Sequence, residues 1–476
     1  MAEVIFEPLN AVHAQIKTSP DVRAELRDCF TFEVPGARFS KLYKAGVWDG
    51  TIKLFKDGKL YVGLYDKLQR LCESRGYPYS IPDIKQPGLT DEQVLEFING
   101  LDIPDKFERR DYQLETIKIA TQNPRAIFLS PTASGKSFMI YNIFRYHNKK
   151  TLLIVPRESL LYQMASDFVD YGYDPDMIHT ISSGAEKWSD KPITIALWQS
   201  AVKMINEPDW WNQFGMIIGD EAHTFAAKSL VTIMESLTEC HYRYGFTGSL
   251  DESKCNAMVL EGLFGPVHVV TTTRELMDAG HVSDLAVNVL ILKHPAPACK
   301  VKRKYQEEVD YLIGSPERNQ FLTELVLNLE GNTLLLFHRI DAHGKLLYEM
   351  LKDCGRPVYF VHGKVKGKDR EVVRKQIEDD ENAILIASVG TFSVGVNIKR
   401  LHNIITASSW KSRVMNLQSI GRGLRLGSDK TICNLYDVVD DLSWKKRKNY
   451  VLQHGEHRIK LYAEQQFDYT VHKIEL

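Results

Sequence analysis

The sequence lacks the patterns that mark secreted, zinc-binding or membrane proteins. Its seven cysteines, among 476 residues, include no CxxC pair, which argues against a disulfide framework or a zinc site. The N-terminus has no basic segment followed by an apolar one, and no run approaches the ~18 apolar residues that a membrane span requires. We therefore expect a soluble protein of the reducing cytoplasm with no membrane partner.

The sequence also lacks an excess of charge of either sign. It has 60 basic and 61 acidic residues, so that any basic surface for nucleic acid must be local. Hydrophobic residues make up 44% of the chain, enough for ordinary globular cores. At about 150 residues per domain, the length predicts roughly three domains.

A phosphate-binding loop is predicted at residues 130–137. The apolar run 126–129 is typical of a buried strand and residues 137–144 of a helix, which is the setting that such a loop requires. Small residues let successive backbone N–H groups surround a polyphosphate, Lys136 reaches the β- and γ-phosphates, and the Ser137 hydroxyl can hold Mg²⁺. The loop residues are Ser130, Pro131, Thr132, Ala133, Ser134, Gly135, Lys136 and Ser137, with Ser130 standing where the motif usually has its first glycine.

Two adjacent carboxylates follow another apolar strand. Asp220 and Glu221 come directly after residues 216–219, at a predicted strand end. A carboxylate there can hold Mg²⁺, and its neighbour can orient and deprotonate the attacking water. We assign these roles to Asp220 and Glu221 respectively, because a phosphate loop lies upstream.

The segments around these motifs alternate between strand and helix patterns. This alternation predicts two parallel sheets covered by helices, with ligands at the carboxyl ends of the strands. We expect domains at 1–90, 107–285 and 300–440, a linker near 293–304, and a C-terminal helical tail at 441–476. The expected strands are 126–129, 152–155, 193–197, 216–219 and 242–246 in the first sheet, and 334–337, 358–361, 383–387, 403–406 and 432–435 in the second.

The N-terminal 90 residues are expected to form a separate small α/β domain with an antiparallel sheet. Between Arg38 and Arg70 are eight basic and three acidic residues, interleaved with the aromatic residues Phe39, Tyr43, Trp48, Phe55 and Tyr61. Basic residues neutralise phosphates and aromatic rings stack on bases, which is one interpretation of this stretch. The other is that the aromatic residues are core and the lysines a solvated face.

Three further segments carry weaker signals. Gln113 could bond the edge of adenine while Tyr112 or Phe107 stacks on it. Residues 246–249 end a strand with two hydroxyls, either a coupling element or a plain turn. The basic run 445–448 could hold phosphate backbone or be a solvated helix end.

A pair of arginines occurs in the second predicted sheet domain. Arg422 and Arg425 stand three apart in a predicted helix and would project from one face. A guanidinium delivered to the γ-phosphate acts as an arginine finger, worth roughly 10³ to 10⁵ in rate. The alternative is an ordinary surface pair.

The ordered motifs between residues 107 and 430 resemble those of superfamily 2 helicases of the DEAH-box type. The resemblance implies two RecA-like domains with ATP in the cleft. It adds Gln418 to the catalytic residues, places Gly395 and Asn397 close to the nucleotide, and places Arg157, Gln199, His362 and Thr391 near the single-strand track. Asn397 stands where many members have Asp. The motifs are 110–113, 131–137, 155–157, 198–200, 220–223, 247–249, 334–338, 388–397 and 418–425.

Segments outside these motifs resemble the recombination and repair helicases of T-even-like bacteriophages. They include residues 32–39, 46–50, 167–171, 211–216 and 454–463. This likeness implies a monomeric ATP-dependent DNA helicase acting in the host cytoplasm on Holliday junctions, stalled forks and R-loops, with recombination and replication proteins as partners. It also implies that the N-terminal domain contacts duplex or branched nucleic acid. An RNA helicase, a duplex translocase and an annealing protein with a weak ATPase remain alternatives.

Overall fold

The computed structural model describes residues 3–250, 253–391, 398–408, 410, 412–426 and 430–476. The chain divides into two compact units. The first contains residues up to 130 and 134–271, and the second contains 131–133 and 272–476.

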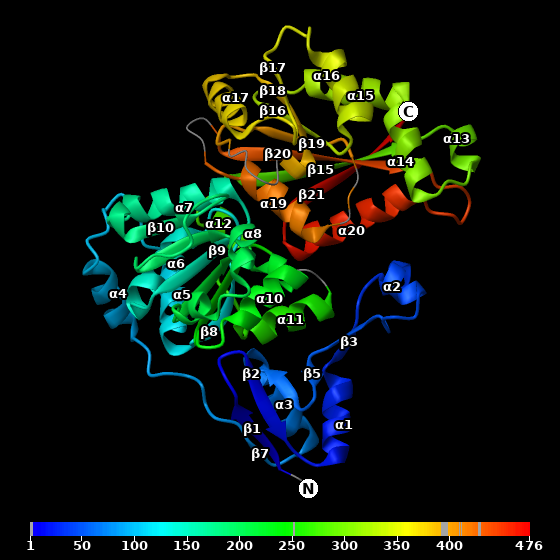
Figure 1. Ribbon diagram of the computed structural model, residues 1–476. Helices are drawn as coiled ribbons and strands as arrows, with labels where there is room; N and C mark the ends of the chain where they lie inside the picture. The colour runs from blue at the N-terminus through cyan, green and yellow to red at the C-terminus, as the bar shows by residue number, and fades with distance from the viewer. Residues whose placement is uncertain (1–2, 251–252, 392–397, 409, 411, 427–429) are drawn as a thin grey trace. The chain divides into compact units, whose positions relative to one another are not determined.

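A seven-stranded sheet forms the centre of the first unit (Figure 1). Its order is β10-β11-β9-β12-β13-β8-β14, and every neighbouring pair is parallel. The strands are β8 (Arg125–Leu129), β9 (Thr151–Val155), β10 (Ile178–Ile181), β11 (Ile193–Leu197), β12 (Met216–Asp220), β13 (Tyr242–Thr247) and β14 (Val267–Val269). The helices are α4 (Asp91–Asn99), α5 (Asp111–Gln122), α6 (Lys136–His147), α7 (Glu158–Asp170), α8 (Trp198–Ala201), α9 (Pro208–Asn212), α10 (Lys228–Ser236) and α11 (Lys254–Phe264).

The central strands are buried and mostly apolar because helices cover both faces of the sheet. All five residues of β9 and of β12 are buried. The expected strands therefore appear with boundaries shifted by at most one residue. Only the edge strands β10 and β14 were not predicted.

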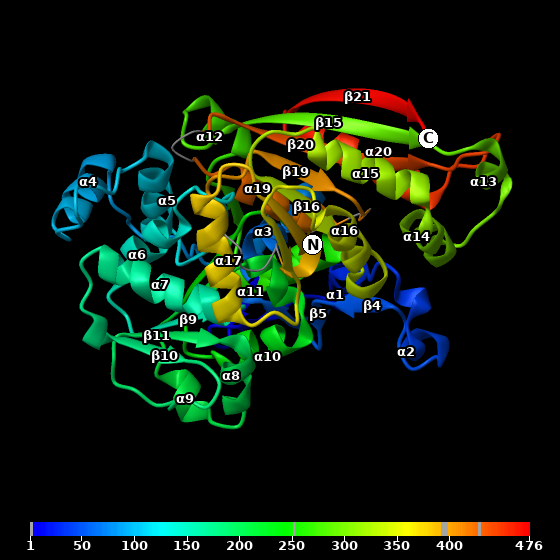
Figure 2. The ribbon, with the colours of Figure 1, turned by 90° about the horizontal axis from the view of Figure 1, so that it is seen from above.

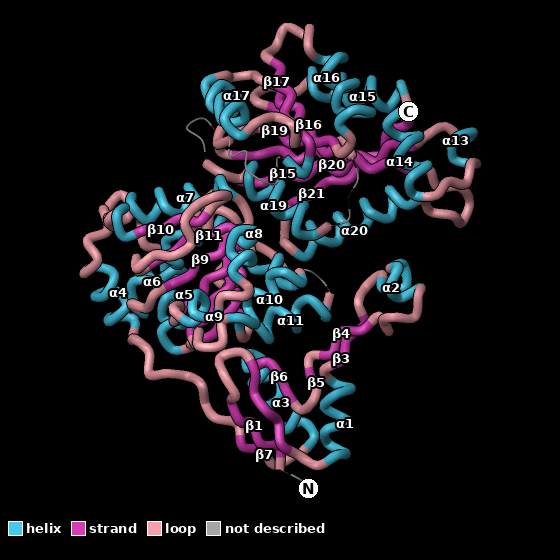
Figure 3. The backbone as a smooth tube through the Cα atoms, viewed as in Figure 1, coloured by secondary structure: helices cyan, strands magenta, loops and turns pink. Residues whose placement is uncertain are grey.

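The N-terminal segment forms a mixed sheet of its own. Its order is β5-β6-β2-β1-β7, and a separate pair, β3 with β4, leads to the short helix α2 (Figure 3). The elements are β1 (Val4–Pro8), β2 (His13–Lys17), α1 (Pro20–Cys29), β3 (Thr31–Glu33), α2 (Lys41–Lys44), β4 (Thr51–Lys53), β5 (Phe55–Lys56), β6 (Lys59–Tyr61), α3 (Tyr65–Arg75) and β7 (Tyr79–Ser80). The central strands β1 and β2 and the helix α1 were not predicted.

This N-terminal sheet packs against the parallel sheet and shares a core with it. Leu60, Leu64 and Phe264 belong to one buried cluster. The Tyr61 hydroxyl donates to Glu235 at 2.6 Å. A Cβ on Gly63 would lie 2.2 Å from the Glu261 carbonyl oxygen, so that only glycine allows this backbone approach.

A second seven-stranded parallel sheet forms the centre of the second unit, in the order β17-β18-β16-β19-β20-β15-β21. Helices α15 to α17 lie on one face, and α19 and α20 on the other (Figure 1). The strands are β15 (Asp284–Lys293), β16 (Thr333–Phe337), β17 (Val358–Val361), β18 (Ile384–Ser388), β19 (Asn403–Thr406), β20 (Ile432–Asp441) and β21 (Asp468–Glu475). The helices are α12 (Thr273–Asp278), α13 (Ala296–Lys300), α14 (Tyr305–Gly314), α15 (Pro316–Leu327), α16 (Lys345–Leu351), α17 (Gly367–Asp379), α19 (Arg413–Gly423) and α20 (Tyr450–Glu464).

The two ends of this unit differ from the expected boundaries. The strand β15 lies between β20 and β21, so the sheet begins before residue 300 and the expected linker at 293–304 lies inside the unit (Figure 2). The tail is a helix, α20, followed by a strand, β21, that pairs with β15. With 15 residues, α20 is the longest helix, and no helix in the described ranges is long and apolar enough to cross a membrane.

We expect Gly63→Ala to destabilise the first unit by about 2 kcal/mol, because its methyl group would overlap two backbone carbonyl oxygens. The matched control is Gly100→Ala, where the nearest atom lies 3.5 Å from the new Cβ and a near-neutral effect is expected. Urea denaturation followed by circular dichroism measures both. Equal midpoints for the two variants would contradict the close packing.

Candidate active site

The loop between β8 and α6 is held in shape by its own serines. The Ser130 and Ser134 hydroxyls are buried and bonded to each other across the loop. Ala133 and Gly135 have φ of +68° and +81°, which turns the backbone before α6 begins at Lys136. The Lys136 ammonium donates to the Ser130 carbonyl oxygen at 3.2 Å. The result is a curled loop at a helix N-terminus, the arrangement that favours phosphate.

Gln113, predicted to bond adenine, also braces this loop. Its Nε2 donates to the Ser134 carbonyl oxygen at 2.9 Å, and its Oε1 accepts from the Arg110 backbone N–H. The Tyr112 hydroxyl donates to the same Ser134 oxygen at 3.2 Å. A Cβ on Gly135 would lie 2.3 Å from Gln113 Nε2, so the glycine is required by space as well as by φ. Neither contact tests the adenine role, which stays a prediction.

Asp220, the last residue of β12, is a buried carboxylate without a full set of partners. Its Oδ1 accepts no hydrogen bond from any described residue. Burial, and then the charge of Glu221, raise the pKa of Asp220 to about 7, while the Lys136 ammonium lowers it. The structure thus brings Lys136, Asp220 and Glu221 together. An unsatisfied carboxylate oxygen beside a phosphate loop fits a divalent cation.

Glu221 stands in a conformation that non-glycine residues rarely adopt. Its φ is +52°, which costs of order 1 kcal/mol and occurs most often at functional sites. His223, which follows, bonds Thr247 Oγ1 through Nδ1 at 2.9 Å and lies 3.4 Å from Glu221 Oε2. The hydroxyl of Thr247 donates to the Ser249 carbonyl oxygen. The Asp-Glu-Ala-His segment is therefore bonded to the 247–249 turn. The sequence suggested a coupling element at 246–249 but predicted neither this bond nor a role for His223.

Tyr171 is a site residue that the sequence did not reveal. Its hydroxyl lies 2.9 Å from Ser137 Oγ, and burial raises its pKa to about 12, so it remains a neutral partner. Phe107, proposed as a base-stacking residue, packs edge-on against Tyr171 at 4.8 Å between ring centroids. In the sequence, Tyr171 stood out only as part of the segment 167–171, which resembles the phage helicases.

Two predicted strand-track residues of the first unit lie at neighbouring strand ends. Arg157 follows β9, and Gln199, which is exposed, lies in α8 directly after β11. These strands pair in register, Leu197 with Val155. Parallel pairing puts both residues at the sheet edge that also carries the phosphate loop.

The second unit brings together the other two. His362 follows β17, and Thr391 follows the adjacent strand β18. Thr391 Oγ1 lies 2.7 Å from Ser388 Oγ, and a Cβ on Gly363 would lie 3.9 Å from it. Burial lowers the pKa of His362, which favours the neutral ring. Their contact with nucleic acid is untested.

The arginine pair differs from the prediction. The helix α19 ends at Gly423, so Arg425 lies beyond the cap residue Leu424 and is not on the helical face of Arg422. Lys430 Nζ and Ser283 Oγ donate to the Arg425 carbonyl oxygen at 3.3 and 3.4 Å, which fixes the turn after the helix. Gln418 is half-buried within α19. The Arg422 side chain and residues Gly395 and Asn397 lie outside the described part of the chain.

We expect Asp220→Asn to stabilise the folded protein above pH 7 in the absence of divalent cations. The pKa of Asp220 rises on folding, so its ionisation penalty grows between about pH 4 and pH 7 and is complete above that. The variant's free energy of unfolding should exceed that of the wild type by of order 2–4 kcal/mol at pH 8, and the difference should vanish below pH 4. Thermal denaturation across this pH range measures it. A gain that does not depend on pH would contradict the buried carboxylate.

Sequence comparisons identify the family. Residues 3–82 match the family described as DNA helicase UvsW, N-terminal, residues 106–252 match type III restriction enzyme, res subunit, and residues 317–427 match helicase conserved C-terminal domain. The chain is 34% identical to the ATP-dependent DNA helicase uvsW of Enterobacteria phage T4 over 98% of both chains.

Structural comparisons agree. The crystal structure of T4 UvsW aligns with a TM-score of 0.52 at 31% identity, covering 99% of both chains. The type ISP restriction-modification enzyme LlaBIII, bound to DNA, shares the fold with a TM-score of 0.57 at 14% identity over 78% of this chain and 32% of that one. The expected fold class, two RecA-like domains behind a small N-terminal α/β sheet, is confirmed. The chain belongs to the UvsW family of superfamily 2, the ATP-dependent DNA helicases.

Proposed function

We propose that this helicase uses ATP hydrolysis to remodel branched DNA, namely Holliday junctions, stalled forks and R-loops, during phage recombination, repair and recombination-dependent replication. The observation that carries the proposal is the full-length match to T4 UvsW, because it includes the N-terminal sheet as well as the helicase domains. We further propose that the protein acts as a monomer in the host cytoplasm with recombination and replication proteins.

We assign the chemistry to the residues at the strand ends of the first unit. Lys136 and the loop N–H groups bind the β- and γ-phosphates, and Glu221 orients water and accepts its proton. Asp220 and Ser137 would hold Mg²⁺, which supplies charge neutralisation to the phosphates. The unsatisfied Asp220 oxygen supports this assignment. The Tyr171 hydroxyl orients that of Ser137.

Residues of the second unit complete the proposed reaction. Arg422 and Arg425 stabilise charge on the γ-phosphate, and Gln418, Gly395 and Asn397 lie near the nucleotide. The nucleic-acid strand along which the enzyme steps is gripped by Arg157 and Gln199 of the first unit and by His362 and Thr391 of the second. Alternation between nucleotide states would convert this grip into movement.

The hairpin formed by β3 and β4, residues 31–53, supports the proposal that the first unit contacts nucleic acid. Phe39 and Tyr43 are 70% and 42% exposed, whereas Phe55 and Tyr61 are buried in the core, so the interpretation of these aromatic residues as core holds for the second pair and not for the first. Arg38 lies over the Phe39 ring at 5.2 Å. Exposed aromatic residues among lysines suit bases and phosphates.

We expect ATP hydrolysis to be stimulated most by a four-way junction, less by single-stranded or duplex DNA, and least by single-stranded RNA. Glu221→Gln should bind ATP and hydrolyse it at least about 100-fold more slowly, because general-base catalysis contributes on that scale. Steady-state phosphate release measures both. Stronger stimulation by RNA would favour an RNA helicase, and no stimulation an annealing protein with a weak ATPase.

We expect Arg425→Ala to retain ATP binding and to lose roughly 10³-fold in hydrolysis rate, since an arginine finger acts on the transition state. The variant keeps the carbonyl that Ser283 and Lys430 contact. Arg339→Ala removes a guanidinium paired with Asp310 and serves as the control. Unchanged hydrolysis in Arg425→Ala would remove its assigned role.

A further inference from the structure

Two basic runs that lie about 140 residues apart in the sequence meet at one place in the second unit. Residues 300–304 and 444–448 together contain eight basic residues and no acidic one. In the sequence, only the second run suggested a phosphate contact, and the first fell within the expected linker. We define the basic patch as these eight side chains: Lys300, Lys302, Arg303, Lys304, Lys445, Lys446, Arg447 and Lys448.

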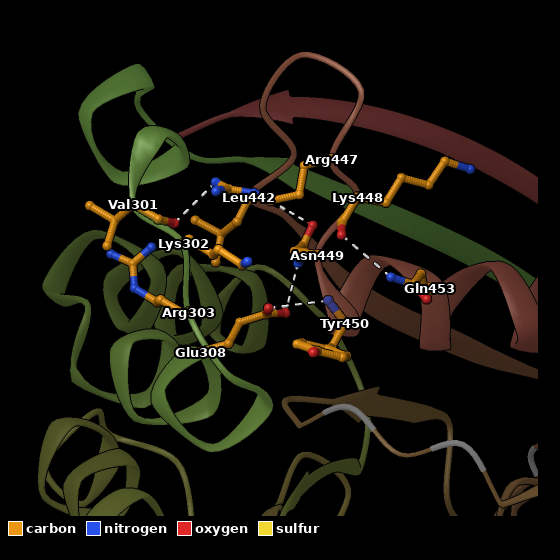
Figure 4. Close-up of a pocket in the computed structure, with 10 residues that line it drawn as sticks. All are labelled: Val301, Lys302, Arg303, Glu308, Leu442, Arg447, Lys448, Asn449, Tyr450 and Gln453. Atoms are coloured by element: carbon orange, nitrogen blue, oxygen red, sulfur yellow. Dashed lines mark hydrogen bonds between the residues drawn. The ribbon is translucent and has the colours of Figure 1, made fainter.

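Direct contacts hold the two runs together. Arg447 donates to the carbonyl oxygens of Cys299 and Val301, the second at 3.1 Å. The Lys300 ammonium lies 5.2 Å from the centre of the Trp444 ring. A pocket of about 170 Å³ lies between the runs, with Lys302 and Arg303 on one wall and Arg447 and Lys448 on the other (Figure 4).

The loop that carries the second run is fixed by a buried carboxylate. Glu308 accepts from Asn449 Nδ2 and from the backbone N–H groups of Tyr450 and Val451, at 2.8, 3.1 and 2.7 Å. It therefore caps α20 and leaves no uncompensated negative charge in the pocket (Figure 4). The cations are displayed by a preformed loop.

Among the described residues, the surrounding carboxylates form an ion pair with one cation of the patch. Asp441 pairs with Lys293 and Asp310 with Arg339, while Glu456 pairs with Lys448 of the patch itself. In the described part of the chain, the five lysines other than Lys448 form no ion pair, and all five are exposed. Such a concentration of charge in a chain of net charge −1 needs a polyanionic partner.

The sheet places the patch in line with the predicted strand track. The two loops follow Lys293 of β15 and Asp441 of β20, which are opposite each other at the carboxyl ends of parallel strands. His362 and Thr391 follow β17 and β18 at the same edge. Five inter-strand spacings of about 4.8 Å separate β17 from β15. The patch therefore lies roughly 24 Å from the His362 loop along this edge of the sheet.

We propose that the basic patch binds the phosphodiester backbone of the DNA arm that continues beyond the strand track. The inference rests on the proposed function and extends it by a second grip on the substrate. Lysines contact phosphates without reading sequence, and a preformed loop loses little conformational freedom on binding. Tyr450, which lines the pocket and is 46% exposed, and Tyr305, which packs against it and is 40% exposed, offer aromatic surface to unpaired bases if the arm is single-stranded.

The test is a triple variant, Lys302→Gln, Lys445→Asn and Lys446→Gln. Asparagine is chosen at 445 because that residue has φ of +53°, which asparagine tolerates. The matched control removes three exposed lysines elsewhere in the unit: Lys352→Gln, Lys460→Gln and Lys473→Gln. Equal melting temperatures establish that both variants are folded.

Binding to single strand, duplex and four-way junction is measured against salt concentration. The triple variant should lower the slope of log K against log salt by about 2 to 3, close to one for each phosphate that a lysine no longer neutralises, and weaken binding about tenfold or more at low salt. The control should match the wild type. If only duplex and junction bind more weakly, the patch holds a duplex arm. If only the single strand binds more weakly, the patch holds an unpaired arm. Each outcome supports the proposed DNA contact.

An unchanged salt slope on all three substrates, with an acidic peptide binding the wild type and not the variant, would overturn the proposal in favour of a protein partner. Hydrolysis stimulated by a short single strand that spans only the track should persist in the triple variant. Absence of that stimulation in the wild type would instead overturn the proposed function, so the two failures are distinguishable.

Discussion

Parallel strand pairing is the constraint on which the functional arrangement depends. In both seven-stranded sheets every strand runs the same way, so all the loops that follow a strand gather at one edge. The phosphate loop, the Asp220–Glu221 pair and the 247–249 turn follow β8, β12 and β13. In the second sheet the same rule aligns the His362 and Thr391 loops with the basic patch.

The buried carboxylates of the two sheets differ in their partners, and this difference separates structural from catalytic roles. Asp437 takes three hydrogen bonds from the buried guanidinium of Arg458 and one from Tyr462. Burial raises the pKa of Asp440, but Arg318 and His294 outweigh it and hold the pKa at about 2. These charges are paired and tie α20 and α15 to β20.

Among the described residues no guanidinium pairs with Asp220, and its pKa rises to about 7. An unpaired buried charge destabilises a fold, so its retention at a strand end is explained by a ligand that satisfies it. The nearby Lys136 ammonium lowers the pKa but does not outweigh burial and the charge of Glu221. The same residue type is thus paired in β20, and in β12 it keeps an oxygen available for the proposed Mg²⁺ ligation.

The sequence predicted what short-range patterns determine. The strand–loop–helix of residues 125–147 and the apolar strands β9 and β12 follow from composition and spacing alone. The strand β21 was missed because it is exposed along almost its whole length and has no apolar run that marks a buried strand. The strand β15 was missed because it falls between the two expected sheet domains. The basic patch was predicted only in part, because its two runs are distant in the chain and the first by itself is an ordinary solvated segment.

The phosphate loop shows how a departure from a motif can be compensated within the structure. Ser130 replaces a glycine whose usual value is to let the backbone turn without a side chain. Here the positive φ values that turn the backbone occur at Ala133 and Gly135. The Ser130 hydroxyl is bonded to that of Ser134 on the buried side of the loop. The side chain is therefore engaged within the loop itself. Gln113, bonded to the Ser134 carbonyl, holds that turn from outside, so the loop is braced from both sides before any nucleotide binds.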